Sequence, residues 1–134
     1  MYLLEGDTYY IKVHGYGMAS ATFQLFANLQ RVVKINTLTE AAEYTYTLGS
    51  GEANFFRFTP DTTGTYKFYT TASTGNPYLE LYDQNMILLT ANDNGGGGEN
   101  AQIAFTLQAG KTYYIKLKNT LNAAGNGNIC FTSS

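Results

Sequence analysis

Oxygen-bearing side chains gather in two segments of the chain whose composition predicts loops. Asp83 and Asn85 belong to the first segment, and the second runs through residues 92–100 around four consecutive glycines. Calcium takes about six to eight oxygen ligands, and backbone carbonyls of a glycine-rich loop can supply several. The spacing fits no EF-hand loop, and Asp and Asn are also ordinary turn residues that bond to their own backbone. Both interpretations stay open, and the candidate calcium ligands are Asp83, Asn92, Asp93 and Glu99.

No recognised catalytic arrangement is apparent in the sequence. The single histidine, His14, has no nucleophile placed near it by the local sequence, and no serine lies in a Gly-x-Ser-x-Gly elbow. Glu80 and Asp83 are close in sequence, but the first is predicted on a strand and the second at the start of a turn, which argues against a paired-carboxylate hydrolase. The glycine run at 95–98 lacks the Gly-Lys-Ser/Thr of a phosphate-binding loop. The sequence therefore predicts a protein that is not an enzyme.

Aromatic residues are abundant, with twelve tyrosines and eight phenylalanines. On a half-buried strand they alternate between the core and the outer face. Outward tyrosines suit the stacking and hydrogen bonding that hold glycans or extended peptides. The alternative is that they pair with Thr and Lys across neighbouring strands and only stabilise the sheet. The candidate ligand-binding residues are Tyr10, Tyr69, Tyr78, Tyr82 and Tyr114.

Short segments of alternating apolar and polar residues recur along the chain, with turn residues between them. This spacing predicts an all-β fold, an antiparallel β-sandwich. The one helix candidate, residues 38–43, is too short to stand alone. Expected strands include residues 44–48, 55–58, 66–70, 78–82, 86–90, 103–107 and 129–132. The alternation predicts a main core of Phe58, Phe68, Leu79, Leu81, Ile103, Phe105 and Ile115.

Charge and cysteine content exclude several classes of function. Eight basic and ten acidic residues leave a net charge of −2, which offers no basic patch for nucleic acid or anionic lipid. No apolar run approaches the roughly 18 residues of a membrane span, and residues 1–5 do not form a signal peptide. The single cysteine, Cys130, cannot form an internal disulfide or a cysteine-based metal cluster. Its position in an expected strand predicts a small core residue rather than a reactive thiol.

One motif, Gly-x-Thr-Tyr-Tyr-Ile-Lys, occurs twice in the chain. It spans residues 6–12 and again residues 110–116, and each copy is followed by a turn and an aromatic strand, so each copy is expected to form the closing hairpin of its repeat. A period of about one hundred residues is the size of one domain in a tandem array. We therefore expect residues 1–27 to be the closing hairpin of a preceding repeat, residues 28–37 a connector, and residues 38–134 a complete repeat.

An isolated hairpin of this kind would expose an apolar face and two open strand edges. Residues 1–27 are therefore expected to dock on a sandwich, on their own chain or by exchange on a neighbouring one. The second arrangement predicts self-association through this segment.

Three motifs in the second half of the chain occur in an order that resembles a known family. They are residues 77–83 (Pro-Tyr-Leu-Glu-Leu-Tyr-Asp), residues 92–96 (Asn-Asp-Asn-Gly-Gly) and residues 109–116 (Ala-Gly-Lys-Thr-Tyr-Tyr-Ile-Lys). Together they resemble the bacterial pre-peptidase C-terminal domain family. Residues 54–60 and 64–66 are similar to the opening hairpin of that family, so the resemblance covers about residues 38–134.

The resemblance implies a jelly-roll-like β-sandwich carried by secreted or surface-attached bacterial proteins, often beside protease domains. It also implies a non-catalytic accessory role, and some members bind calcium or extended protein substrates. Asn76 and Asn94 stand where the family pattern has Asp, and both changes remove a carboxylate that a tight calcium site would use.

Taken together, these features predict a non-catalytic repeat module of a bacterial secreted or cell-surface protein. It would act as a spacer or as a weak binding unit for extracellular protein or glycan. The alternative is a calcium-dependent domain that targets an extracellular protease or other hydrolase to its substrate.

Overall fold

The computed structural model describes residues 3–4, 32–33, 35–38 and 43–133. The chain divides into two compact units, Met1–Lys34 and Ile35–Ser134. In the first unit, β1 (Leu3–Leu4) pairs in parallel with β2 (Val32–Val33). The expected hairpin at residues 1–27 and the helix candidate at 38–43 lie largely outside the described residues, so their structures stay predictions.

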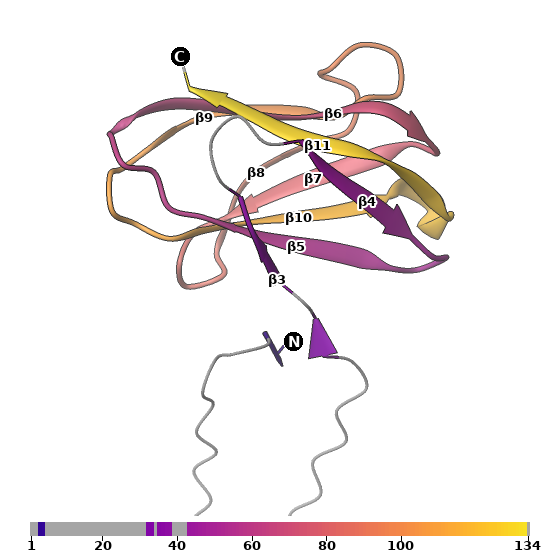
Figure 1. The fold of residues 1–134 in the computed structure, drawn as a ribbon, viewed down its shortest axis with the longest axis horizontal. Helices are drawn as coiled ribbons and strands as arrows, with labels where there is room; N and C mark the ends of the chain where they lie inside the picture. Colours follow the sequence, from indigo (N-terminus) through magenta and orange to yellow (C-terminus); the bar gives the residue numbers. More distant parts are fainter. Residues whose placement is uncertain (1–2, 5–31, 34, 39–42, 134) are drawn as a thin grey trace, which may run out of the picture. The chain divides into compact units, whose positions relative to one another are not determined.

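The second unit is a β-sandwich built from two sheets (Figure 1). Every strand pair in it is antiparallel except β3 with β5, so the predicted all-β, antiparallel sandwich is confirmed. The five-stranded sheet has the order β3 (Ile35–Thr37), β5 (Ala53–Phe58), β10 (Tyr113–Asn119), β7 (Pro77–Tyr82) and β8 (Leu88–Asn92). The four-stranded sheet has the order β4 (Tyr44–Leu48), β11 (Gly125–Ser133), β6 (Gly64–Thr74) and β9 (Gln102–Leu107).

From β4 onwards, only β7 and β8 follow one another in the chain and also pair as neighbours in a sheet. All other successive strands from β4 to β11 alternate between the sheets, as in a jelly roll. The second copy of the repeated motif is therefore not a hairpin, and that part of the prediction is wrong. Its first strand is β10 in one sheet and its second is β11 in the other, joined by the short 3₁₀ turn η1 (Thr120–Asn122). Alternation identifies the inward face of each strand but not the sheet to which the strand belongs.

The core lies between the two sheets and contains aromatic and aliphatic side chains from both. Phe58 lies at its centre, with ring centroids 5.1 Å from Tyr66, 5.3 Å from Phe68 and 4.8 Å from Phe131. Six of the seven expected core residues are buried. The seventh, Phe105, is only partly buried and packs against the others from the edge strand β9. The buried six are Phe58, Phe68, Leu79, Leu81, Ile103 and Ile115.

Several strands, including β6 and β11, are longer than expected, and two further differences concern β8 and β3. Strand β8 begins at Leu88 rather than at residue 86, because Met86 has a positive φ of 60° that interrupts the extended backbone. Part of the expected connector forms β3, which pairs in parallel with β5. In the part of the chain that the structure describes, no helix has the length and apolar character to cross a membrane.

Candidate binding surface

Strands β7 and β10 lie side by side in the five-stranded sheet and bring three tyrosines onto one face. In their register Tyr82 is opposite Tyr114, and Tyr78 is opposite Lys118. Because Ile115 and Leu117 point into the core, these residues occupy the outer face. We call this surface the tyrosine face. It consists of Tyr78, Glu80, Tyr82, Tyr114, Lys116 and Lys118.

Glu80 contacts three other residues of the tyrosine face through its carboxylate. Its Oε2 lies 2.9 Å from Lys116 Nζ and also accepts a hydrogen bond from the Tyr82 hydroxyl at 2.9 Å. Its Oε1 lies 3.0 Å from Lys118 Nζ. The side chains of Glu80 and Lys116 are only 12% and 13% exposed. Burial by itself would raise the pKa of Glu80, but the hydrogen bonds from Lys116, Lys118 and Tyr82 outweigh burial and lower the pKa below its usual value.

The rings of the tyrosine face combine internal contacts with partial exposure. Lys118 Nζ lies 4.8 Å from the centroid of the Tyr78 ring, which is cation–π geometry. The side chains of all three tyrosines, Tyr78, Tyr82 and Tyr114, are half-buried. Phe55, which lies opposite Lys116 on the neighbouring strand β5, is fully buried. The face therefore presents aromatic surface held in place by charged neighbours.

Tyr69 lies on the other sheet and does not join the tyrosine face. It occupies β6 opposite Cys130 of β11, on the outer face of the four-stranded sheet. Tyr10 lies outside the described residues. The structure thus brings three of the five predicted binding tyrosines together.

Cys130 is buried, as expected, but it is on the outer face of β11 rather than in the core. The inward positions on either side of it belong to Ile129 and Phe131. Burial is the main cause that raises the pKa of the Cys130 thiol above its usual value, and the negative charge of Glu43 raises this pKa further. The neutral, unreactive form is favoured at physiological pH.

The predicted calcium ligands occupy two separate places. Asp83 starts the turn before β8, and Asp93 follows the end of β8 with Glu99 further along the same loop. A strand rises roughly 3.3 Å per residue, so the five residues of β8 hold the two aspartates about 16 Å apart. Calcium–oxygen distances are about 2.3–2.6 Å, so one ion cannot contact both. Across the described residues, no three acidic, histidine or cysteine side chains are close enough to hold a metal.

Two of these candidate ligands already bond to the backbone of their own loops. Asp83 Oδ1 accepts the backbone N–H groups of Asn85 and Ile87, each at 2.8 Å. Asn92 Oδ1 accepts the N–H of Gly95 at 2.5 Å. These contacts match the turn interpretation of the two residues.

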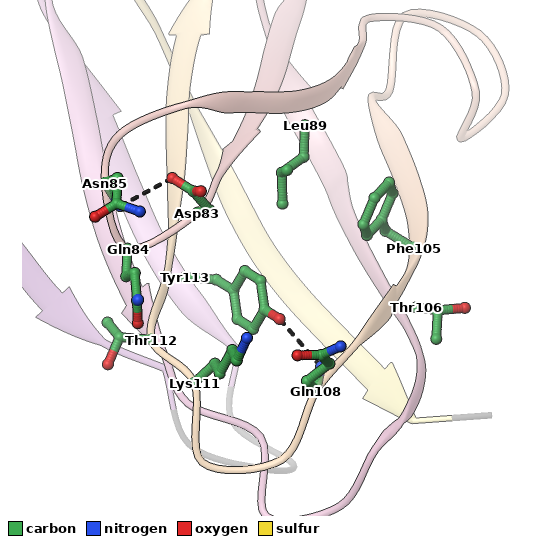
Figure 2. Close-up of a pocket in the computed structure, with 10 residues that line it drawn as sticks. All are labelled: Asp83, Gln84, Asn85, Leu89, Phe105, Thr106, Gln108, Lys111, Thr112 and Tyr113. Atoms are coloured by element: carbon green, nitrogen blue, oxygen red, sulfur yellow. Dashed lines mark hydrogen bonds between the residues drawn. The ribbon is translucent and has the colours of Figure 1, made fainter.

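A cleft that the sequence did not predict lies between the β7–β8 turn and the β9–β10 loop (Figure 2). Its volume is about 300 Å³, and Leu89, Phe105 and Tyr113 provide its apolar surface. The cleft forms because β8 and β9 are the edge strands of their sheets, which leaves the core open beside them. Strand alternation places Phe105 inward but does not show that its strand lies at an edge.

Comparisons with known proteins identify the fold. No protein-family model matches the sequence, and no curated protein matches it either. Among solved structures, the pre-peptidase C-terminal domain of collagenase from Bacillus anthracis is similar, with a TM-score of 0.64 and 11% identity over 77% of this chain and 99% of that one. A periplasmic inhibitor of g-type lysozyme from Aeromonas hydrophila is also similar, with a TM-score of 0.53 and 11% identity over 75% of this chain and 97% of that one.

These likenesses concern the fold of the second unit. The second unit has the β-sandwich fold of a pre-peptidase C-terminal domain, which agrees with the resemblance seen in the sequence motifs. At 11% identity the similarity concerns the fold, and function has to be argued from the surface of this chain.

Proposed function

We propose that this protein is a non-catalytic binding module of a secreted or cell-surface bacterial protein, and that its tyrosine face holds an extended protein or glycan. The observation that carries the proposal is the position of Tyr82 opposite Tyr114, with Tyr78 on the same face. Three half-buried rings on one sheet face offer apolar contact surface, and the hydrogen bond from the Tyr82 hydroxyl to Glu80 holds one of these rings in place.

The charged residues favour binding because they fix the face before a partner arrives. Glu80 bonds to two lysines and to Tyr82, which restricts the rotamers of all four side chains. Fewer side chains then lose freedom when a partner binds. Arg57, opposite Tyr114 and exposed, adds a donor at the border with β5.

A non-catalytic role is supported by the chemistry of the described residues. The raised pKa of the Cys130 thiol disfavours a cysteine nucleophile. The names of the similar proteins also support the proposal. One is an inhibitor of a lysozyme, which is a protein-binding role, and the other is a domain of a collagenase.

The collagenase domain favours a second candidate, an accessory domain that brings an extracellular hydrolase to its substrate. The tyrosine face would serve that role equally, because substrate targeting also needs a surface that holds an extended polymer. Calcium dependence is the weaker part of this candidate, since Asp83 lies at the opposite end of β8 from the other predicted ligands.

Co-sedimentation of the full chain with insoluble polymers tests the proposed function. Suitable probes are fibrillar collagen, peptidoglycan and cellulose. We expect at least one to bind the protein, and the double variant Tyr82→Ser and Tyr114→Ser to bind about tenfold more weakly. Tyr69→Ser, on the other sheet, is the matched control and should bind normally. Circular dichroism confirms that each variant is folded. Absence of binding to every polymer, or an equal loss in the Tyr69 variant, would refute the proposal.

We also retain the proposal that residues 1–27 belong to a second sandwich of a tandem array. The second copy of the repeated motif supplies β10 and β11, which are interior strands of their sheets. By analogy, the first copy would complete another sandwich, on its own chain or on a neighbouring one. Light scattering measures the mass of the full chain and of a chain without residues 1–27. If the segment is exchanged between chains, the full chain should be a dimer and the shortened chain a monomer.

A further inference from the structure

The cleft between the β7–β8 turn and the β9–β10 loop has two firmly held walls. In the first wall, Asp83 Oδ1 accepts the N–H groups of Asn85 and Ile87, and the Asp83 N–H donates to the carbonyl of Ile87 at 3.0 Å. In the second wall, the Gln108 N–H donates to the Tyr113 hydroxyl at 3.1 Å. Walls fixed in this way bind a ligand without a large cost in ordering.

The β9–β10 loop is also held by hydrogen bonds to residues outside the cleft. The N–H of Ala109 donates to Thr63 Oγ1 at 3.0 Å, and the N–H of Gly110 donates to the carbonyl of Pro60 at 2.8 Å. These bonds hold the loop by its backbone. The side chains of Gln108 and Lys111 stay exposed at the cleft.

The lining of the cleft is polar but nearly neutral. One carboxylate, Asp83, is balanced by one ammonium group, Lys111, and the side-chain amides of Gln84, Asn85 and Gln108 complete the rim (Figure 2). Each amide offers both an acceptor oxygen and a donor NH₂ group. Asp83 uses Oδ1 for its turn, and the described residues give its Oδ2 no bond, so this oxygen is an acceptor for a ligand hydroxyl.

The apolar part of the lining contains the ring of Phe105 and the side chain of Leu89, both partly buried. A pyranose has hydroxyl groups around its rim, which both donate and accept, and C–H groups on its faces. A lining with no net charge and with paired donors and acceptors beside an aromatic ring matches that chemistry. A volume of about 300 Å³ is at the small end of ligand sites.

We propose that this cleft binds a neutral sugar residue, at a site separate from the tyrosine face. The apolar face of the sugar would lie against Phe105 and Leu89. Its hydroxyl groups would bond to Asp83 Oδ2 and to the amides of Gln84 and Gln108. An anionic or strongly apolar ligand fits less well, because the lining has one charge of each sign and a rim of amides.

Nuclear magnetic resonance on the ¹⁵N-labelled full chain tests the site. The probes are glucose, galactose, mannose and N-acetylglucosamine at millimolar concentration, with glucuronate and a leucine-containing tripeptide for comparison. We expect at least one neutral sugar to shift the backbone amide signals of Asn85, Gln108 and Lys111. Gln108→Ala should weaken that binding by about tenfold. Its side chain is exposed, and the bond to Tyr113 comes from the backbone, so the wall is retained.

Gln102→Ala is the matched control, because Gln102 lies on β9 opposite Tyr69, away from the cleft. It should bind the sugar normally. Three results would each overturn the inference: no sugar shifts these signals, only glucuronate or the peptide shifts them, or Gln108→Ala has no effect. Sugar-induced shifts confined to the amides of Tyr82 and Tyr114 would also overturn it, while supporting the proposed function of the tyrosine face.

Discussion

Lys116 Nζ lies 2.9 Å from Glu80 Oε2, directly across the pairing of β10 with β7. Each side chain is almost entirely covered, so the pair is a fixed part of the outer face and not a mobile surface contact. The Glu80 carboxylate has two further partners. Lys118 Nζ lies 3.0 Å from its Oε1, and the Tyr82 hydroxyl donates to its Oε2 at 2.9 Å. The orientation of two of the three tyrosine-face rings therefore depends on the ionised state of Glu80, because Tyr82 donates to it and Lys118 lies over Tyr78.

Replacing Glu80 with Gln should lower the free energy of unfolding by about 1–3 kcal/mol at neutral pH, the usual range for hydrogen bonds to charged groups. The folded-state pKa of Glu80 is lowered, so its contribution is complete above the unfolded-state value of about 4.3 and is lost as the pH falls through the lower folded-state value. Urea unfolding of both proteins as a function of pH measures this. Glu99→Gln, in an exposed loop position, is the control. A stability difference that does not shrink in acid would contradict the assignment.

Replacing Asp83 with Ala should destabilise the protein by about 1–2 kcal/mol, because two backbone N–H groups lose their acceptor. The loss should be equal in millimolar calcium and in chelator, since the role of Asp83 is to hold the turn. Thermal melting in both solutions measures it, with Asp93→Ala at the other end of β8 for comparison. If the destabilisation appears only with calcium, Asp83 is a metal ligand and the turn interpretation is wrong.

Replacing Phe58 with Ala should cost about 3–5 kcal/mol, because its ring contacts three other aromatic rings in the core. Phe105→Ala should cost less, about 1–3 kcal/mol, because Phe105 lies on an edge strand beside the open cleft. Chemical denaturation of the two variants gives the comparison. Equal losses would mean that the cleft is closed in solution.

Replacing Gly125 with Ala should destabilise the sandwich by about 1–3 kcal/mol through overpacking. A Cβ at this position would collide with the carbonyl oxygen of Thr74 and with the side chain of Asn119. Asn119 cannot move aside easily, because it is buried and its Nδ2 donates to the carbonyl of Ala123 at 3.1 Å. Gly64→Ala is the matched control, since no heavy atom lies within 4 Å of its added Cβ. Thermal melting should show a clear loss for Gly125→Ala and none for Gly64→Ala.

Local sequence patterns predicted most of the strands and most of their inward faces, although β3 and the outward position of Cys130 were missed. Alternation placed Phe58, Leu81 and Ile115 in the core correctly, because side chains on a strand point to opposite faces with a period of two. The same rule placed Tyr78, Tyr82 and Tyr114 on outward positions. These properties depend only on neighbours along one strand, so the sequence alone determines them.

Which strands become neighbours was decided only by the tertiary structure. The sequence predicted a hairpin for the second repeated motif, but β10 and β11 belong to different sheets, and Tyr69 is consequently on the sheet opposite Tyr114. The separation of Asp83 from Asp93 follows from the length of β8. The cleft beside Phe105 follows from the edge positions of β8 and β9 in their sheets. Strand pairing joins residues far apart in the chain through backbone hydrogen bonds that every sequence can form, so local patterning carries little information about it.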